Sequence, residues 1–188
     1  RWAELTAPGW KRKLLLEDPR TSTPGFAAVL TVQEILGAEA RAFWKKLRSS
    51  WLTLAPGWDE AYGLFLKGQA PLVWSYTSSE AYHRKEGSNR YRALLLDDAG
   101  LTQVEGAGLI RGSTSTNEEK ARALCFLRLL ISPGVQAEVA EHQWMWPVLK
   151  SVTLPASFEG IVEPKRVLSV QLTREERTRR LAEWRAAW

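Results

Sequence analysis

The sequence predicts an α/β fold, because short apolar segments alternate along the chain with segments of helical periodicity. Apolar runs that stop at a proline or a polar turn indicate strands at residues 14–19, 51–56 and 71–77. Each run is followed by a polar segment and then by apolar residues at helical spacing. The 188 residues, of which 45% are hydrophobic and 25% charged, suffice for one sizeable domain or two small lobes.

Capping residues set the helix boundaries in the first half of the chain. Thr23 is the expected N-cap of the first helix and Pro24 its first helical residue. Asp59 is expected to cap the third helix, and Ser78 or Ser79 the fourth. Helices are therefore predicted at 25–37, 38–50, 60–68 and 78–86.

The second half of the chain is predicted to be mainly helical. Strands are expected at 91–96 and 103–112, and Asn117 is expected to cap a helix over 118–132. Pro133 begins the next helix, and the segment after it is mostly irregular. A last helix is expected from Thr173 onward, with three apolar residues at helical spacing: Leu181, Trp184 and Trp188.

Composition excludes several classes of protein. No run approaches the roughly 18 apolar residues of a membrane helix. The only cysteine, Cys125, allows neither an intrachain disulfide nor a cysteine metal cluster, and its apolar surroundings predict a buried side chain. The net charge is +5, with basic residues gathered at 45–48 and 173–185 on expected solvated helix faces. Because no recognised motif accompanies this charge, no nucleic-acid partner is expected.

Catalysis is not expected either. The chain has two histidines, and neither lies in a motif that joins a nucleophile, a base and an orienting group. No cysteine pair or histidine cluster suggests zinc. We therefore predict a non-enzymatic protein without a metal or cofactor.

Three polar segments with hydroxyls or aromatic rings follow predicted strands and precede predicted helices, the places where α/β folds bind ligands. They are 19–25, 55–63 and 75–83. Hydroxyls at a helix N-terminus can hold an anionic or hydroxyl group, and aromatic faces can stack on a flat cation. The pattern suits a ligand with a planar cationic part and a polar or phosphorylated tail, although each ring could instead be core. The candidate residues are Thr21, Ser22, Trp58, Tyr76, Tyr82 and Trp144.

Six motifs resemble the thiamine-binding proteins of bacterial ABC importers. The motifs are EDPRTSTPG (17–25), GWDEAYGLFLKG (57–68), SYTSSEAYH (75–83), QVEGAG (103–108), ISPGVQ (131–136) and WMWPV (144–148). The resemblance implies a type II periplasmic-binding-protein-like fold and a chain that is the C-terminal part of it. Residues 8–100 would form the second lobe, and 101–188 a crossover strand and helices that complete the first lobe and the hinge.

The resemblance also assigns roles within the predicted site. Thr21 and Ser22 should lie at the phosphate or hydroxyethyl end of thiamine. The cleft should be lined by the aromatic candidates Trp58, Tyr76, Tyr82 and Trp144. Thr23 and Ser75 would contact these ligand-binding residues rather than the ligand itself. Two departures from the family pattern are Trp146, where tyrosine is usual, and Trp74, where a smaller aliphatic residue is common.

The function that this resemblance implies is the capture of thiamine, or its mono- or diphosphate, outside the cytoplasm and its delivery to a membrane permease. Without the N-terminal segment of the family, apolar surface would be exposed or covered by self-association. Three alternatives stay open: a related carrier of iron, polyamine or phosphonate, an enzyme of thiamine metabolism, and a basic nucleic-acid binder. Colour from a bound ferric ion would identify an iron carrier, and turnover of a thiamine analogue would identify an enzyme. Steeply salt-dependent binding to DNA would identify a nucleic-acid binder.

Overall fold

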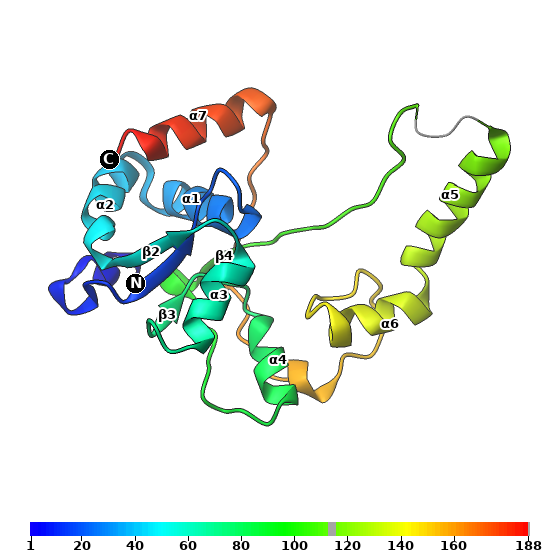
Figure 1. Cartoon of the computed structure of the whole chain (residues 1–188), viewed down its shortest axis with the longest axis horizontal. Helices are drawn as coiled ribbons and strands as arrows, with labels where there is room; N and C mark the ends of the chain where they lie inside the picture. The colour runs from blue at the N-terminus through cyan, green and yellow to red at the C-terminus, as the bar shows by residue number, and fades with distance from the viewer. Residues whose placement is uncertain (113–115, 188) are drawn as a thin grey trace. The chain divides into compact units, whose positions relative to one another are not determined.

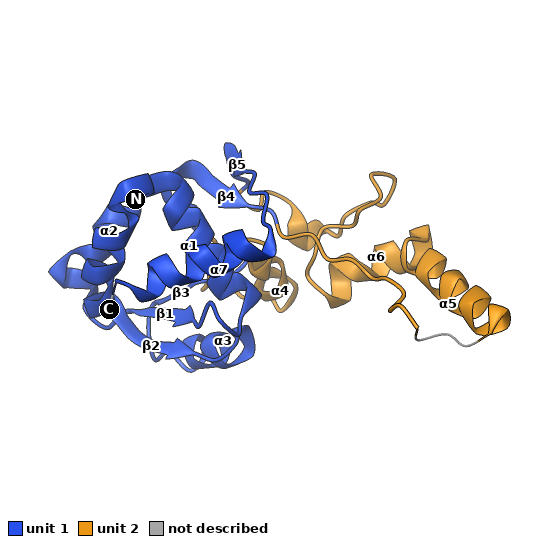
Figure 2. Ribbon diagram, turned by 90° about the horizontal axis from the view of Figure 1, so that it is seen from above, with its two compact units in different colours: residues 1–76, 94–102, 163–188 blue, residues 77–93, 103–162 orange. Residues whose placement is uncertain are grey.

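A computed structural model describes residues 1–112 and 116–187, which form two compact units. Unit 1 comprises residues 1–76, 94–102 and 163–188, and unit 2 comprises residues 77–93 and 103–162 (Figure 2). These boundaries differ from the predicted division after residue 100. Since the predicted lobes refer to a longer protein, that division stays a prediction.

Unit 1 is built on a parallel three-stranded sheet (Figure 1). Strand β1 (Leu14–Glu17) lies at its centre, between β2 (Trp51–Ala55) and β3 (Leu72–Val73). A second parallel pair joins β4 (Ala99–Leu101) to β5 (Arg166–Leu168). The helices of unit 1 are α1 (Thr23–Leu36), α2 (Ala40–Leu47), α3 (Trp58–Leu66) and α7 (Arg174–Arg185). Its 3₁₀ turns are Trp2–Thr6, Pro8–Trp10, Gly37–Glu39, Arg48–Ser50 and Leu96–Asp98.

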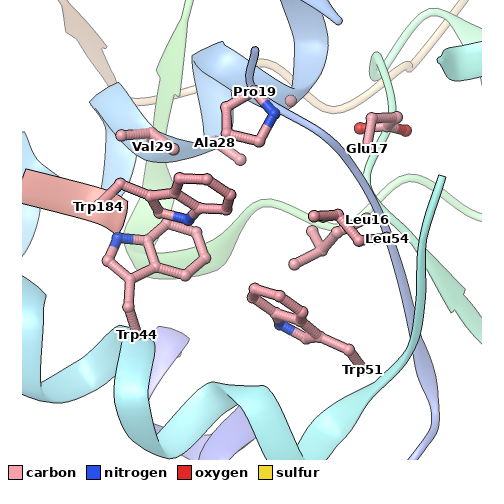
Figure 3. Close-up of a pocket in the computed structure, with 10 residues that line it drawn as sticks. Leu16, Glu17, Pro19, Ala28, Val29, Trp44, Trp51, Leu54 and Trp184 are labelled. Carbon is pink, nitrogen blue, oxygen red and sulfur yellow. The ribbon is translucent and has the colours of Figure 1, made fainter. Parts of the chain in front are cut away.

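The two faces of β1 bury different side chains, because successive residues of a strand point to opposite sides. Leu14 and Leu16 join the aromatic core, to which α1, α2 and α7 contribute. Leu16 and Glu17, neighbours on the strand, both line a small cavity beside that core (Figure 3). The small cavity on the core side has a volume of only about 10 Å³, room for roughly one water molecule. This cavity is therefore a gap in packing and is too small for a thiamine-sized ligand.

Among its described residues, unit 2 combines helices with long irregular segments and has a small core. Its helices are α4 (Ser79–Lys85), α5 (Asn117–Leu130) and α6 (Pro133–His142), with a 3₁₀ turn at Ala156–Phe158. Ala81, Ala140, Phe158 and Ile161 form the core. Helix α5 buries none of its residues, so Cys125 is exposed and the prediction of a buried thiol was wrong.

Most predicted helices are present, but several caps and strands differ. Thr116 rather than Asn117 caps α5, through a reciprocal capping box with Glu119. The predicted strands at 91–96 and 103–112 are absent, because these segments have no strand partner in the part of the chain that the structure describes. Trp184 lies in the predicted last helix and is buried in unit 1, whereas Trp188 lies outside the described residues.

Candidate functional site

Four of the six candidate residues follow the strands of the three-stranded sheet. Because β1, β2 and β3 are parallel, the segments after them emerge at the same edge. Thr21 lies in the turn after β1, and its hydroxyl donates a 2.6 Å hydrogen bond to the carbonyl of Pro56 after β2. This hydrogen bond joins the turn after β1 (residues 18–22, hereafter the hydroxyl turn) to the segment between β2 and α3.

Ser22 begins α1. Its backbone N–H bonds the carbonyl of Asp18 at 2.9 Å, and its Oγ accepts a 3.2 Å hydrogen bond from the N–H of Gly25. The N-cap is therefore Ser22, and the prediction of Thr23 was wrong by one residue. A serine hydroxyl that accepts as a cap still has its proton to donate, so Ser22 can bind a further acceptor at the helix N-terminus.

Trp58 is the first residue of α3 and is half-buried. Its ring stacks on Tyr62 one helical turn later, with centroids 4.5 Å apart and planes 20° from parallel. The indole N–H donates a 2.8 Å hydrogen bond to the hydroxyl of Ser75, which follows β3. Tyr76, the next residue, is 38% exposed. The N-cap of α3 is Gly57, and Asp59 lies inside the first turn of the helix. The prediction that Asp59 caps this helix was therefore wrong.

An ion pair stiffens the turn that carries Thr21 and Ser22. The Arg20 guanidinium binds the Asp18 carboxylate with both Nε and Nη2, and the backbone N–H of Arg20 donates to Asp18 at 2.9 Å. These hydrogen bonds from Arg20 lower the pKa of Asp18, against the opposing effect of its burial. The Asp18 carboxylate therefore stays ionised, and its oxygens accept hydrogen bonds within the turn.

Glu17 adds a buried acid directly before this turn. Its side chain is 1% exposed, and neither carboxyl oxygen has a partner outside its own residue among the described residues. Removal from water raises the pKa of Glu17 to about 8, an effect that its own backbone N–H only partly offsets. The carboxyl is therefore largely protonated at neutral pH.

The other two candidates form an aromatic pair in unit 2. The rings of Tyr82, on α4, and Trp144, after α6, lie 5.4 Å apart at 70°, an edge-to-face arrangement. The backbone of Trp144 has a φ of 53°, a conformation that is rare for a bulky residue. Such strain is found preferentially at functional sites, where surrounding contacts enforce it.

Buried Glu80 fixes the helix that presents Tyr82. Its carboxylate accepts hydrogen bonds from Arg84 at 2.6 Å, from Arg92 at 2.9 Å and from the N–H of Ala93 at 2.7 Å. Arg84 also donates to the carbonyl of Glu159. Burial raises the pKa of Glu80, but the bonds from Ala93, Arg92 and Arg84 outweigh it and lower that pKa.

Sequence reasoning missed three residues around the candidates: Tyr62 and Lys85, which contact candidate rings, and Glu80, which holds the helix that carries Tyr82. The spacing of Trp58 and Tyr62 by one helical turn was a readable signal. The i,i+4 pair of Glu80 with Arg84 lies within α4. The sequence did not point to the other two partners of Glu80, Arg92 and Ala93, which come from outside that helix. The candidates thus form two groups, Thr21 with Ser22, Trp58 and Tyr76 on unit 1, and Tyr82 with Trp144 on unit 2.

The described residues also bear on metal binding and on membrane insertion. No group of three histidine, cysteine, aspartate or glutamate side chains there could hold a metal ion. No single described helix has both the length and the hydropathy to cross a membrane, and α5 and α6 meet that test only jointly, across a 61° bend.

Comparisons with known proteins concern the family and the fold of the chain. Residues 1–162 match the family described as bacterial extracellular solute-binding protein. A thiamine-binding periplasmic protein of Brucella melitensis is 42% identical over 98% of this chain, and one of Escherichia coli is 37% identical over 98%. In both cases the chain spans only about half of the relative, 55% of its length.

Solved structures confirm the predicted type II periplasmic-binding-protein-like α/β fold. A periplasmic thiamin binding protein matches 98% of this chain and 57% of its own, with a TM-score of 0.85 and 37% identity. An ABC transporter protein from Clostridium perfringens matches 99% of this chain and 61% of its own, with a TM-score of 0.65. At 16% identity the second likeness concerns the fold alone. With its matched family profile, its relatives and its fold in agreement, the chain belongs to the bacterial extracellular solute-binding protein family.

Proposed function

We propose that this chain is part of the substrate-binding component of an ABC importer that captures thiamine or its phosphates. Binding is non-covalent, in a cleft between the two lobes of the complete protein, outside the cytoplasm. The loaded protein then delivers its ligand to a membrane permease. The observation that carries this proposal is the near-complete coverage of the chain by relatives named thiamine-binding periplasmic protein, at 37–42% identity.

The chemistry of the candidate residues supports a ligand that is both cationic and polar. Thiazolium is a flat cation, and the faces of Trp58 and Trp144 can attract it at about 0.5 to 2 kcal/mol each. The hydroxyls of Thr21 and Ser22 stand at the N-terminus of α1, which favours an anionic or hydroxyl group. We assign the ring end of thiamine to the aromatic residues and its tail to the hydroxyl turn.

No chemical change of the ligand is part of this proposal. None of the candidate groups pairs a nucleophile with a base, and the thiol of Cys125 lies on exposed α5. Thiamine recovered unchanged after prolonged incubation is the expected result.

The test is calorimetric titration of thiamine and of thiamine diphosphate. It uses the 188-residue chain alone and the same chain joined to the part of the Brucella melitensis relative that lies outside the match. We expect tight binding by the joined protein and weaker binding by the chain alone, since closure contacts need both lobes. No heat from a folded joined protein would contradict the thiamine assignment and favour another small ligand.

Two matched variants test the assigned residues. Tyr82 and Tyr91 both contact the ring of His83, at 5.0 and 4.2 Å between centroids, but Tyr82 also contacts Trp144. Tyr82→Leu should lower thiamine affinity by about tenfold, whereas Tyr91→Leu should leave it within about twofold. Equal losses in both variants would point to a general effect on unit 2 rather than to contact with the ligand.

A further inference from the structure

Lys85 lies over the same Trp144 ring to which the proposed function assigns the cationic part of the ligand. Its ammonium nitrogen lies over the Trp144 ring, 5.5 Å from the centroid. Lys85 follows Tyr82 by three residues on α4, so both side chains project from one face of the helix toward the same indole. The chain therefore supplies its own cation to the aromatic pair.

The hold on Lys85 allows it to leave that ring. Its Nζ pairs with Glu141 Oε2 at 2.9 Å, and the two side chains are 42% and 48% exposed. Exposed pairs of this kind are weak and change partners readily. Lys85 and Glu141 also line a groove of about 450 Å³ with Arg84, Pro155, Ala156 and Ser157. The groove gives the ammonium group room to move off the ring while it stays near Glu141.

We propose that Lys85 is a specificity-determining residue, which weakens the binding of cationic ligands because it competes with them for the Trp144 ring. This inference rests on the proposed function. One ring face accommodates one cation, so a thiazolium ring can stack there only after Lys85 has withdrawn. The affinity for thiamine is then set by the difference between two cation–ring contacts rather than by one contact alone.

Glu141 determines how readily Lys85 withdraws. While the carboxylate is present, it attracts the ammonium group toward the groove and also adds negative charge beside the ring. Without the Glu141 carboxylate, the Trp144 ring is the one contact that remains to the Lys85 ammonium group of the two described above. Loss of the lysine and loss of the glutamate should therefore change affinity in opposite directions, which a purely structural contribution of the pair would not do.

The experiment measures thiamine dissociation constants for the joined protein and four variants. Lys85→Met should bind thiamine about 2- to 30-fold more tightly, the range expected when one cation–ring contact no longer has to be displaced. Lys85→Arg keeps a cation that stacks on indole, so it should bind no more tightly than the parent. Glu141→Gln should bind more weakly. Lys120→Met removes the same charge from exposed α5 and should leave affinity unchanged.

The outcomes separate the two proposals. Unchanged or weaker binding by Lys85→Met, beside normal binding by the parent, would overturn the role of Lys85 alone. Tighter binding by Lys120→Met to the same extent would also overturn it, because net charge would then explain the gain. Absence of thiamine binding by the folded parent would overturn the proposed function, and the role of Lys85 with it.

Discussion

The indole N–H of Trp58 donates a 2.8 Å hydrogen bond to the hydroxyl of Ser75, which ties the first residue of α3 to the segment after β3. Those two segments flank the turn after β1, because β1 is the central strand. Ser75→Ala should cost about 1 kcal/mol of stability and weaken ligand binding, since Trp58 loses the bond that orients it. Ser75→Thr keeps a hydroxyl and should restore both. Denaturant unfolding and titration check this, with exposed Ser49→Ala as the control.

Ser22 should separate stability from binding. Ser22→Ala removes the cap oxygen of α1 and should cost about 1 kcal/mol, whereas Ser22→Gly costs only a few tenths. Both variants lose the hydroxyl proposed to contact the ligand, so both should bind more weakly. If the glycine variant binds as the parent does, the hydroxyl is a cap and nothing more.

Gly25 is irreplaceable for steric reasons. A Cβ atom at this position would lie 2.5 Å from the carbonyl oxygen of Glu17, and backbone atoms cannot yield as a flexible side chain can. Gly25→Ala should cost about 3 kcal/mol or more and displace the hydroxyl turn. Gly134→Ala is the matched control in the first turn of α6, since a Cβ there has nothing within 4 Å. Equal unfolding midpoints for the two variants would contradict this prediction.

Glu17 should make unit 1 less stable as pH rises. Burial raises its pKa from 4.5 to about 8, so the folded state keeps a proton that the unfolded chain loses above 4.5. Its contribution is thus fully present below pH 4.5 and declines up to pH 8, by about 4 to 5 kcal/mol. Glu17→Gln should flatten this slope, whereas exposed Glu39→Gln should retain it. Unfolding free energies measured from pH 4 to 9 provide the check.

Glu80 should affect the pH dependence of stability in the opposite direction to Glu17, because it makes the folded state less stable as pH falls. Its pKa is lowered in the folded state, so its contribution is present above pH 4.5 and is lost as pH falls through the lowered pKa. Glu80→Gln should cost about 2 to 3 kcal/mol at neutral pH, because Arg84 and Arg92 lose a buried partner. Glu118 and Arg122 form the same helical pairing in water, and Glu118→Gln should change stability by less than about 0.5 kcal/mol. Similar losses in both variants would show that burial of Glu80 adds nothing.

Local sequence chemistry predicted the elements that depend on neighbours in the chain. Proline, glycine and hydroxyl residues located α1 and α6 to within one or two residues, because caps involve adjacent backbone groups. The same reasoning predicted β1, the strand that precedes the hydroxyl turn. Periodicity predicted only an α/β fold, whereas the resemblance to thiamine-binding proteins predicted the type II periplasmic-binding-protein-like fold.

Contacts distant in sequence were the ones missed. The apolar residues of segment 103–112 suggested a strand, but the sequence alone cannot supply the neighbouring strand that the ladder requires. Glu80 resembles any surface helix residue until Arg92 and Ala93 are placed beside it. Cys125 was misjudged for the same reason, because an apolar pattern identifies the face of a helix but not what covers it.

The common edge of the three-stranded sheet has an evolutionary consequence. At this edge the candidate residues lie in turns or at the first residue of a helix, whereas the leucines and tryptophans that hold unit 1 together belong to its buried core. Substitutions in the turns can therefore alter what is carried without disturbing the aromatic core. A lineage of transport proteins could exchange one nutrient for another by drift in a few loop positions, while the scaffold stays under separate selection for folding.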